Sequence, residues 1–279
     1  MNNNTRPLVS VIISTYNRPQ LLERAINSVI NQDYNNIEVI ISDDCSSYDI
    51  DSLIEKIKKI SKFPIYLIRN SSNKGACYTR NKGIHFSNGS FIAGLDDDDE
   101  FTSNRISLLM NNYDPKYSLV TSNTLVVSKN RTFALFSSRK NKVINIYDML
   151  WENVIGTQCL VEKARIIALE GFDVNLSSAQ DADMWLRLVE GYGPALRVKE
   201  STYLLHTEHD NPRISSSKNK INGLINYTNK HKHHMNSGQL AYSKFKILLW
   251  SNKKIQAICS LNLHSFLYII KKLFLKLIK

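Results

Sequence analysis

Several features are scarce in this sequence of 279 residues, and each scarcity excludes a class of protein. The first residues, Met-Asn-Asn-Asn-Thr-Arg-Pro, include no apolar stretch, so we expect no signal peptide. No run of about 18 apolar residues occurs, which predicts no membrane-spanning helix. The four cysteines are far apart and form no CxxC pair, so neither a zinc site nor a disulfide framework is indicated. Reduced thiols are typical of a cytosolic protein, and we expect a cytoplasmic location.

Asp and Glu are absent from residues 211–279, although this stretch holds thirteen Lys and Arg residues. The whole chain has 36 basic and 25 acidic residues and a net charge of +11, which leaves 23 basic against 25 acidic residues in the first 210. The positive charge therefore belongs to the C-terminal part alone. A nucleic-acid-binding protein is expected to carry a basic stripe on its folded body, so we expect no nucleic-acid partner.

Short β-branched runs alternate with helical periodicities over the first hundred residues. The runs lie at residues 8–14, 37–41, 65–68 and 90–95. This alternation predicts an α/β fold with a doubly wound, mostly parallel sheet and helices on both faces, in which ligands bind beyond the carboxyl ends of the strands. Further strands are expected near residues 118–128 and 156–161, and a helix is expected to open at Ser178.

The composition shifts after residue 215 to Lys, Asn, Ile and Leu. We therefore predict a main domain of residues 1–215, with halves of about 1–100 and 101–215. A basic, helical extension of residues 216–279 is expected to follow it.

Five adjacent carboxylates, residues 96–100, follow the fourth predicted strand. They repel one another, so such a cluster is costly unless a cation holds it. Oxygen ligands suit Mg²⁺ or Mn²⁺, which can also bridge a diphosphate. The alternative is a solvated acidic loop, but the position after a buried strand favours a metal site.

Other polar groups also stand at ends of predicted elements. Asp44 follows the second strand and can accept a hydrogen bond from a uracil or a ribose, although Asp-Asp-x-Ser is also an ordinary turn. Tyr16 follows the first strand and can stack on a base or pack. Asp181 lies three residues after Ser178, so it also fits the acid of a helix capping box.

Five stretches occur in the order in which family 2 glycosyltransferases carry their motifs, and together they make this sequence resemble that family. The stretches are Ser-Val-Ile-Ile-Ser-Thr-Tyr-Asn-Arg (10–18), Ser-Asp-Asp-Cys-Ser (42–46), Lys-Gly-Ala-Cys-Tyr-Thr-Arg-Asn-Lys-Gly (74–83), Leu-Asp-Asp-Asp-Asp (95–99) and Gln-Asp-Ala-Asp-Met-Trp-Leu-Arg (180–187). The resemblance covers roughly residues 8–210. It implies a GT-A fold and a metal-dependent enzyme that moves a sugar from a nucleotide-sugar donor to a hydroxyl and inverts the anomeric centre.

The resemblance also implies roles for single residues. The expected donor nucleotide-binding residues are Thr15, Tyr16, Arg18, Asp44, Arg80, Asp96 and Asp97. Among these, Tyr16 and Asp44 match uracil contacts, which makes UDP the expected nucleotide. Asp98 matches the direct ligand of Mn²⁺ or Mg²⁺ in the DxD motif, and Asp181 matches the general base. Gln180 replaces the usual Glu before that base, and Cys45 stands where Gly is commoner.

Two further segments are expected near the site by the same resemblance. His209 is a candidate metal ligand and Arg213 a candidate phosphate contact, whereas His206 continues an apolar run and is expected to pack. His231, His233 and His234 are expected in a solvated loop. The expected acceptor residues are Trp151, Gly156, Thr157 and Gln158. For Trp151 the alternatives are a sugar-stacking platform and a core position.

Residues 261–279 have an apolar stripe at helical spacing, with lysines on the other face. This pattern is typical of a helix that lies on an anionic membrane surface, and the alternative is a helix docked on the protein or a dimer partner. The membrane interpretation suggests a lipid-linked acceptor and a peripheral location on the inner face of a bacterial cytoplasmic membrane.

The function expected from these features is transfer of a hexose or N-acetylhexosamine from a UDP-sugar to a glycan or lipid-linked acceptor, as in synthesis of bacterial O-antigen, capsule or lipooligosaccharide. The alternative is a catalytically inert scaffold that acts as a basic membrane- or nucleic-acid-binding module. The acids Asp44, Asp96, Asp98 and Asp181 favour the enzyme, because a scaffold need not keep them. A nucleotidyltransferase would need a Gly-rich basic loop after the first strand, which residues 15–18 do not form.

Overall fold

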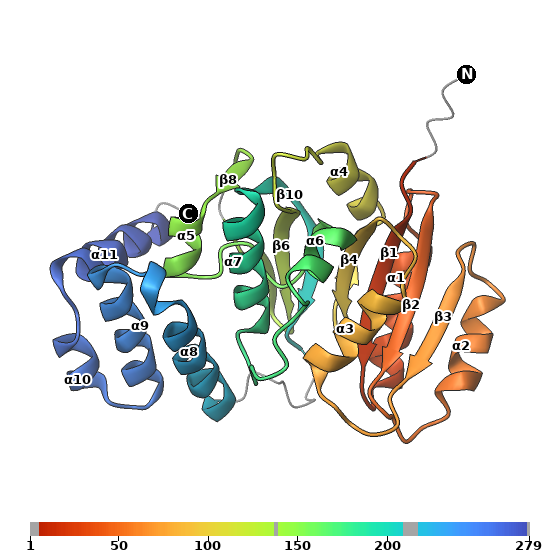
Figure 1. The fold of residues 1–279 in the computed structure, drawn as a ribbon, viewed down its shortest axis with the longest axis horizontal. Helices are drawn as coiled ribbons and strands as arrows, with labels where there is room; N and C mark the ends of the chain where they lie inside the picture. The colour runs from red at the N-terminus through yellow and green to blue at the C-terminus, as the bar shows by residue number, and fades with distance from the viewer. Residues whose placement is uncertain (1–5, 137–138, 209–216, 278–279) are drawn as a thin grey trace.

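The computed structural model describes residues 6–136, 139–208 and 217–277 (Figure 1). A twisted β-sheet runs through the middle of the molecule, and helices cover both of its faces. The strands are β1 (Val9–Thr15), β2 (Ile37–Asp43), β3 (Ile65–Arg69), β4 (Phe91–Asp96), β5 (Glu100–Phe101), β6 (Val120–Ser128), β7 (Arg131–Ala134), β8 (Lys142–Ile144), β9 (Leu160–Glu162) and β10 (Ala195–His206).

The helices alternate with these strands in the first half of the chain and gather at its C-terminal end. They are α1 (Pro19–Ile30), α2 (Ile50–Lys58), α3 (Ala76–Phe86), α4 (Arg105–Asn111), α5 (Ile146–Trp151), α6 (Lys163–Ala168), α7 (Gln180–Tyr192), α8 (Ser217–His231), the short 3₁₀ helix η1 (Lys232–His234), α9 (Ser237–Trp250), α10 (Lys254–Cys259) and α11 (Leu263–Leu277).

The sheet has the strand order β3-β2-β1-β4-β9-β6-β10-β5. Strands β1 to β4 pair in parallel, β9 is antiparallel to both β4 and β6, and β10 is parallel to β6. The α/β fold predicted from the sequence is thereby confirmed, and the first four strands begin within one residue of the predicted positions. Because β1 lies between β2 and β4, its carboxyl end is flanked by two others, and the chain reverses its order there.

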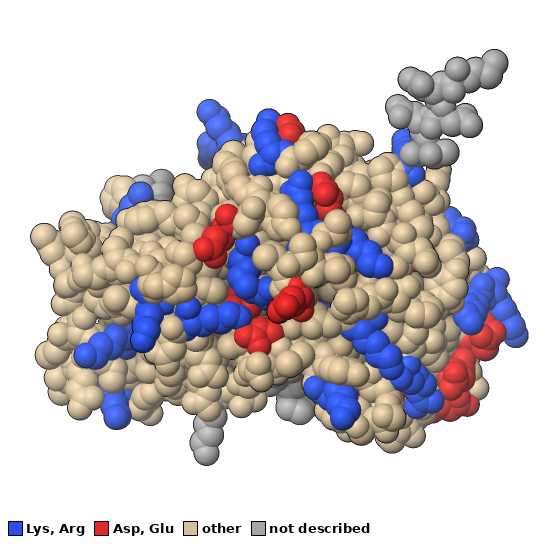
Figure 2. All heavy atoms as spheres, viewed as in Figure 1, with Lys and Arg blue, Asp and Glu red and all other residues tan. Residues whose placement is uncertain are grey.

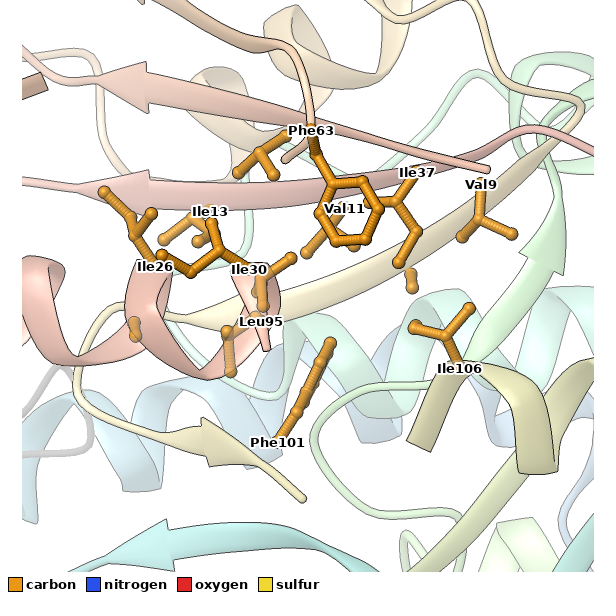
Figure 3. Close-up of a cluster of buried hydrophobic side chains, with 14 of the residues drawn as sticks. Val9, Val11, Ile13, Ile26, Ile30, Ile37, Phe63, Leu95, Phe101 and Ile106 are labelled. Atoms are coloured by element: carbon orange, nitrogen blue, oxygen red, sulfur yellow. The ribbon is translucent and has the colours of Figure 1, made fainter. Parts of the chain in front are cut away.

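Two apolar cores lie on opposite faces of the sheet, because successive side chains of a strand point in opposite directions. Val11 and Ile13 of β1 pack with Ile26 and Ile30 of α1 on one face (Figure 3). On the other face, Ile12 belongs to a core that includes residues of α3, α5 and α7. Both faces of β1 are therefore buried, which explains its continuous apolar run.

Helices α8 to α11 pack beside α5 and α7 at one end of the molecule (Figure 1). Gly223 of α8 lies so close to Ser178 that a side chain at position 223 would overlap the Ser178 backbone and hydroxyl. Helix α8 thus packs closely on the predicted main domain. The division of the chain at residue 215 stays a prediction. Within the described residues, no helix combines the length and the apolarity that are needed to cross a membrane.

Candidate active site

The carboxyl ends of β1, β2 and β4 lie side by side and carry most of the polar motifs. The strand register places Thr15 beside Asp43 and Ser14 beside Asp96. The loops that follow these strands therefore meet at one edge of the sheet, as the fold requires. This edge is the candidate active site.

The loop after β1 is bound to the acid run after β4. Thr15 donates a hydrogen bond from Oγ1 to Asp97 at 2.8 Å, and Arg18 Nη1 lies 3.0 Å from an Asp97 oxygen and 3.4 Å from an Asp98 oxygen. Tyr16 lies between them in the sequence, and its side chain is 45% exposed. An exposed tyrosine at a strand end is available to stack on a planar ligand.

Asp44 organises the loop that connects β3 to α3. Its carboxylate accepts hydrogen bonds from the Asn70 side chain at 2.8 Å and from the backbone N–H groups of Lys74 at 2.7 Å and Gly75 at 2.8 Å. The turn that the sequence offered as an alternative is formed by Asp43, whose carboxylate accepts a hydrogen bond from the backbone N–H of Ser46 at 3.1 Å. A carboxylate has about four acceptor positions, so the three bonds to Asp44 leave one for a ligand.

The acid run Asp96 to Asp99 is largely buried. Burial raises the pKa of Asp97 to about 6, although Arg18 opposes it, and burial together with the charges of Asp96 and Asp98 raises the pKa of Asp99 well above its usual value. Tyr203 and the backbone N–H of His206 donate hydrogen bonds to Asp99 at 2.8 and 2.9 Å. Carboxyl groups that are hard to ionise together gain from a nearby cation.

Arg80 joins the acid run to the predicted base. The buried guanidinium donates from Nη2 to Asp96 Oδ1 at 3.1 Å, and its Nη1 lies 3.8 Å from Asp181 Oδ1. Phe172 covers the guanidinium, whose carbon lies 4.8 Å from the ring centre. Arg80 thus holds together residues that are 85 positions apart in the chain, at β4 and at the start of α7.

Asp181 lies in the first turn of α7, and no capping bond occupies it. The capping box that the sequence offered as the alternative role for Asp181, with Ser178 as N-cap, is not formed: the N-cap is Ala179 in a left-handed conformation, with φ of 61°. Ser178 instead donates a hydrogen bond to the carbonyl of Asn219 in α8. Asp181 Oδ1 is buried and has no hydrogen bond to any described residue. Burial and the charge of Asp96 raise the pKa of Asp181 to about 7, although Arg80 lowers it.

The predicted acceptor residues before β9 lie close to the acid run. Gln158 is buried, and its amide donates to Asp96 Oδ1 at 2.8 Å, while Gly156 has φ of +109° and its carbonyl accepts a hydrogen bond from the Trp185 indole at 3.1 Å. Thr157 lies between them and is partly exposed. Gln158 therefore positions the Asp96 carboxylate through this hydrogen bond. Gly156 and Thr157 border the same edge of the sheet. The predicted strand at 156–161 begins only at Leu160, because this turn precedes it.

Trp151 does not form an open sugar-stacking platform, which corrects one of the two alternatives. Its ring is buried and stacks on Tyr268 of α11, with ring centres 4.1 Å apart and an angle of 12° between the planes. Tyr242 of α9 lies at 5.8 Å. Helices that follow Trp151 by about a hundred residues therefore cover the face that a sugar would need.

His206 is buried at the end of a strand, as expected, whereas His231 lies elsewhere than the sequence predicted. His206 ends β10, where its Nε2 lies 2.8 Å from Glu100 and its Nδ1 lies 3.3 Å from Glu208, so it borders the acid run. His231 is buried at the end of α8 and lies 2.8 Å from Asp183, which corrects the expected solvated loop. The sequence carried no signal for the contact of His206 with Glu100, because that contact requires β10 and β5 to be neighbours. His209 and Arg213 lie outside the described residues.

The donor atoms at this site suit a hard divalent cation held partly by a substrate. Among the described residues, no group of three or more His, Cys, Asp or Glu side chains converges to hold a metal ion by protein ligands alone. Mg²⁺ is commonly bound by one or two carboxylates together with phosphate oxygens and water. The partly exposed carboxylate of Asp98, next to the buried acids, fits that arrangement.

Comparisons with known proteins agree on the family. The family model described as glycosyl transferase family 2 matches residues 10–165. The chain is 36% identical over 265 residues to WcaA of Escherichia coli (strain K12), named provisionally as a colanic acid biosynthesis glycosyl transferase, with 91% of each chain covered. It is 29% identical to the GalNAc(5)-diNAcBac-PP-undecaprenol beta-1,3-glucosyltransferase of Campylobacter jejuni, with 79% of this chain and 72% of that protein covered.

A solved structure shares the fold at low sequence identity. Residues 1–349 of TarS from S. aureus, in complex with UDP-GlcNAc, match with a TM-score of 0.66 and 17% identity, covering 86% of this chain and 72% of that one. The relatives and the family model thus support an enzyme over an inert scaffold. On the evidence of its motifs, its sheet and these matches, the chain belongs to glycosyl transferase family 2.

Proposed function

We propose that this glycosyltransferase moves a hexose or N-acetylhexosamine from a UDP-sugar to a hydroxyl of a glycan or lipid-linked acceptor, with inversion, in bacterial O-antigen, capsule or lipooligosaccharide synthesis. The observation that carries the proposal is the Asp96–Arg80–Asp181 arrangement. It places Asp181 Oδ1, a buried oxygen without a hydrogen-bond partner among the described residues, beside the acid run. The similar TarS structure holds UDP-GlcNAc, and the similar Campylobacter jejuni enzyme is named for an undecaprenyl diphosphate acceptor.

The donor nucleotide is proposed to lie on the loops after β1 and β2. Tyr16 offers an exposed ring for the base, and Asp44 keeps one acceptor position for the imide N–H of uracil. Asp96 and Asp97 face the ribose and diphosphate side together with Thr15 and Arg18. Arg80 supplies a positive charge at the same edge.

Mn²⁺ or Mg²⁺ is proposed as the cofactor, with Asp98 as its direct ligand and His209 as a second candidate. When bound, such an ion neutralises the negative charge that grows on the departing diphosphate. Of the four adjacent carboxyl groups, those of Asp97 and Asp99 are buried, and those of Asp96 and Asp98 are partly exposed. Arg18 contacts both Asp97 and Asp98, and its positive charge opposes the rise in the pKa of Asp97 that burial causes.

Asp181 is the proposed general base. Its raised pKa, about 7, lets the carboxylate accept a proton near neutral pH. The acceptor hydroxyl gives its proton to Asp181 as its oxygen bonds to the anomeric carbon. On the opposite side, the bond from that carbon to the diphosphate oxygen breaks, and UDP leaves. Arg80 opposes the effect of burial and so preserves the ionised form of the base.

The acceptor is proposed to approach over residues 156–158, and Arg213 is a proposed phosphate contact. The enzyme is then expected at the cytoplasmic face of the membrane, where lipid-linked sugars are presented. The C-terminal helix is the proposed membrane contact.

A donor panel tests this function. Release of UDP from several UDP-sugars would be measured with Mn²⁺ or Mg²⁺ and with a bacterial lipid extract, for the wild type, Asp98→Ala and the exposed control Asp33→Asn. We expect metal-dependent release from one sugar, lost in Asp98→Ala and kept in Asp33→Asn. If no UDP-sugar binds or reacts with either metal, the donor assignment is wrong.

A further inference from the structure

Helix α11 turns its apolar stripe away from the protein. The stripe residues are exposed: Leu263, at one end of the stripe, is 71% exposed, and Phe274, at the other end, is 62% exposed. The other members are Phe266, Leu267, Ile270 and Leu273. With 3.6 residues per turn, these six positions fall within an arc of about 120°. A surface helix normally buries such a stripe against the core, so α11 is mounted in the reverse sense.

The opposite side of α11 is fixed to the protein by specific contacts. Ser265 is fully buried, Tyr268 stacks on Trp151, and the Lys272 ammonium forms an ion pair with Glu152. Tyr242 of α9 also donates a hydrogen bond to Glu152, at 2.5 Å. Lys272, which the sequence placed on the face opposite the apolar stripe, therefore attaches the helix to the protein. The orientation of the stripe follows from these contacts.

Helix α10 also carries exposed apolar side chains, in addition to the stripe of α11. Ile255 is 80% exposed and Ile258 is 67% exposed, while Ala257 on the other side of the helix is buried. Both α10 and α11 pack against α9, at the end of the molecule farthest from β3 (Figure 1). Large aliphatic side chains at this exposure on two neighbouring helices indicate a contact surface.

The charge around these helices selects the partner. Lys253, Lys254 and Lys271 are exposed, and residues 211–279 contain no Asp or Glu. On the face shown in Figure 2, the region of α9 to α11 carries Lys and Arg but no acidic residues. A second copy of this chain would bring like charges together, whereas an anionic lipid headgroup has the complementary sign.

We propose that α10 and α11 form a two-helix docking surface for an anionic bilayer. The aliphatic and aromatic side chains of both helices enter the interfacial layer, and the lysines beside them contact lipid phosphates. Through Trp151 and Glu152, α11 is fixed to the end of α5. The segment that follows α5 leads to Gln158, which donates a hydrogen bond to Asp96. The docking surface is inferred from the exposed apolar side chains and lysines of α10 and α11. Its use in presenting a lipid-linked acceptor rests on the proposed function.

Vesicle flotation with the full chain tests this surface. The wild type would be compared with the variant Ile255→Ser, Ile258→Ser, Phe266→Ser and Phe274→Ser, on phosphatidylcholine vesicles with and without phosphatidylglycerol. We expect the wild type to bind the anionic vesicles at least about tenfold more tightly than the neutral ones, with weakening by salt. The variant is expected to lose at least about tenfold of that binding, since its replaced side chains enter the bilayer.

A matched control removes apolar surface elsewhere. Ile60→Ser with Val174→Ser replaces side chains that are also exposed, in the main domain, and is expected to bind vesicles as the wild type does. Because all replaced residues are solvent-exposed, each variant should keep the wild-type circular dichroism spectrum and UDP affinity. UDP binding without vesicle binding would overturn the docking surface and leave the transferase intact. Vesicle binding without UDP binding would overturn the donor assignment alone.

Two other outcomes would also overturn the proposal. Equal binding of the wild type to neutral and anionic vesicles would remove the role of the lysines. A concentration-dependent dimer in sedimentation velocity, lost in the four-residue variant and without vesicle binding by the wild type, would assign the surface to a second copy.

Discussion

At the residue scale, the site depends on buried charges that hold one another in place. Arg80 lies between Asp96 and Asp181, and Gln158 donates to the same Asp96 oxygen that Arg80 contacts. Two donors on one oxygen fix the orientation of this carboxylate before any ligand arrives. Preorganised groups of this kind cost no rearrangement during the reaction, so small displacements of Asp96 are expected to affect turnover.

Gly94 tests this positioning. A side chain at position 94 would overlap the Gln158 amide, so Gly94→Ala should push Gln158 away from Asp96. We expect a loss of about 1–3 kcal/mol in the free energy of unfolding, as in other overpacked cores, together with reduced turnover. Urea denaturation and a UDP-release assay would measure the two effects.

Two controls accompany Gly94→Ala. Gly191→Ala, in a helix where the nearest atom to a new Cβ is 3.9 Å away, should be neutral or slightly stabilising. The double variant Gly94→Ala, Gln158→Ala should regain stability but not turnover. Wild-type stability and turnover in Gly94→Ala alone would contradict the role assigned to Gln158.

At the element scale, helix α8 is attached to α7 through one buried carboxylate. The Asp183 carboxylate contacts Lys230 Nζ and His231 Nε2 of α8, each at 2.8 Å. It also contacts Arg187 Nη2 of its own helix at 2.8 Å. Although burial opposes it, these hydrogen bonds and charges lower the pKa of Asp183 to about 2. Asp183 lies two residues after the proposed base, so this attachment also fixes the start of α7.

Asp183→Asn is expected to destabilise the fold. The pKa of Asp183 is depressed from its usual 3.8 to about 2, which corresponds to roughly 2 kcal/mol. Because the folded-state pKa is the lower one, this stability is present above about pH 4 and is lost as the pH falls through 2. Urea denaturation between pH 7 and pH 2 should therefore show a smaller acid-dependent loss in Asp183→Asn.

The exposed pair of Asp114 with Lys116 provides the comparison for Asp183→Asn. Asp114→Asn should change stability little, since surface ion pairs contribute little. Equal stability of Asp183→Asn and the wild type at pH 7 would show that α8 is held by other contacts.

The elements that the sequence predicted well are those whose signal is local. The first four strands are continuous β-branched runs, buried on both faces, and such runs are recognisable without knowing their neighbours. The turn at Gly156 and the left-handed Ala179 were not predictable, because they depend on contacts with Trp185 and with the segment around Asn219. Trp151 was undecided for the same reason: the ring that covers it lies in α11.

The candidate site was predictable in its acids and less so in its supporting contacts. The motifs identified Asp96, Asp98 and Asp181. The sequence could not reveal that Arg80 contacts both Asp96 and Asp181, or that Gln158 donates a hydrogen bond to Asp96. His206 is buried as expected, but its contact with Glu100 was not foreseen, since it depends on the pairing of β10 with β5. These relations cross long sequence separations, and a one-dimensional pattern carries no record of them.

At the scale of the whole molecule, charge is divided between a slightly acidic main domain and an acid-free C-terminal part. The acids of residues 43–44 and 96–100 lie at strand ends, and the exposed lysines Lys253, Lys254 and Lys271 lie on or just before the helices that carry the exposed stripes. One end is therefore suited to a cation and a diphosphate, and the other to an anionic surface. The central claim is that these parts serve one reaction, glycosyl transfer with Asp181 as the base.

The most direct measurement of this claim is the turnover of Asp181→Asn at saturating UDP-sugar, with donor affinity measured in parallel. The account predicts that kcat falls by about 10²–10⁴-fold while donor affinity is unchanged, because the amide keeps the shape of the side chain but cannot accept the acceptor proton. Wild-type turnover in Asp181→Asn would contradict the account, since another group would then be the base.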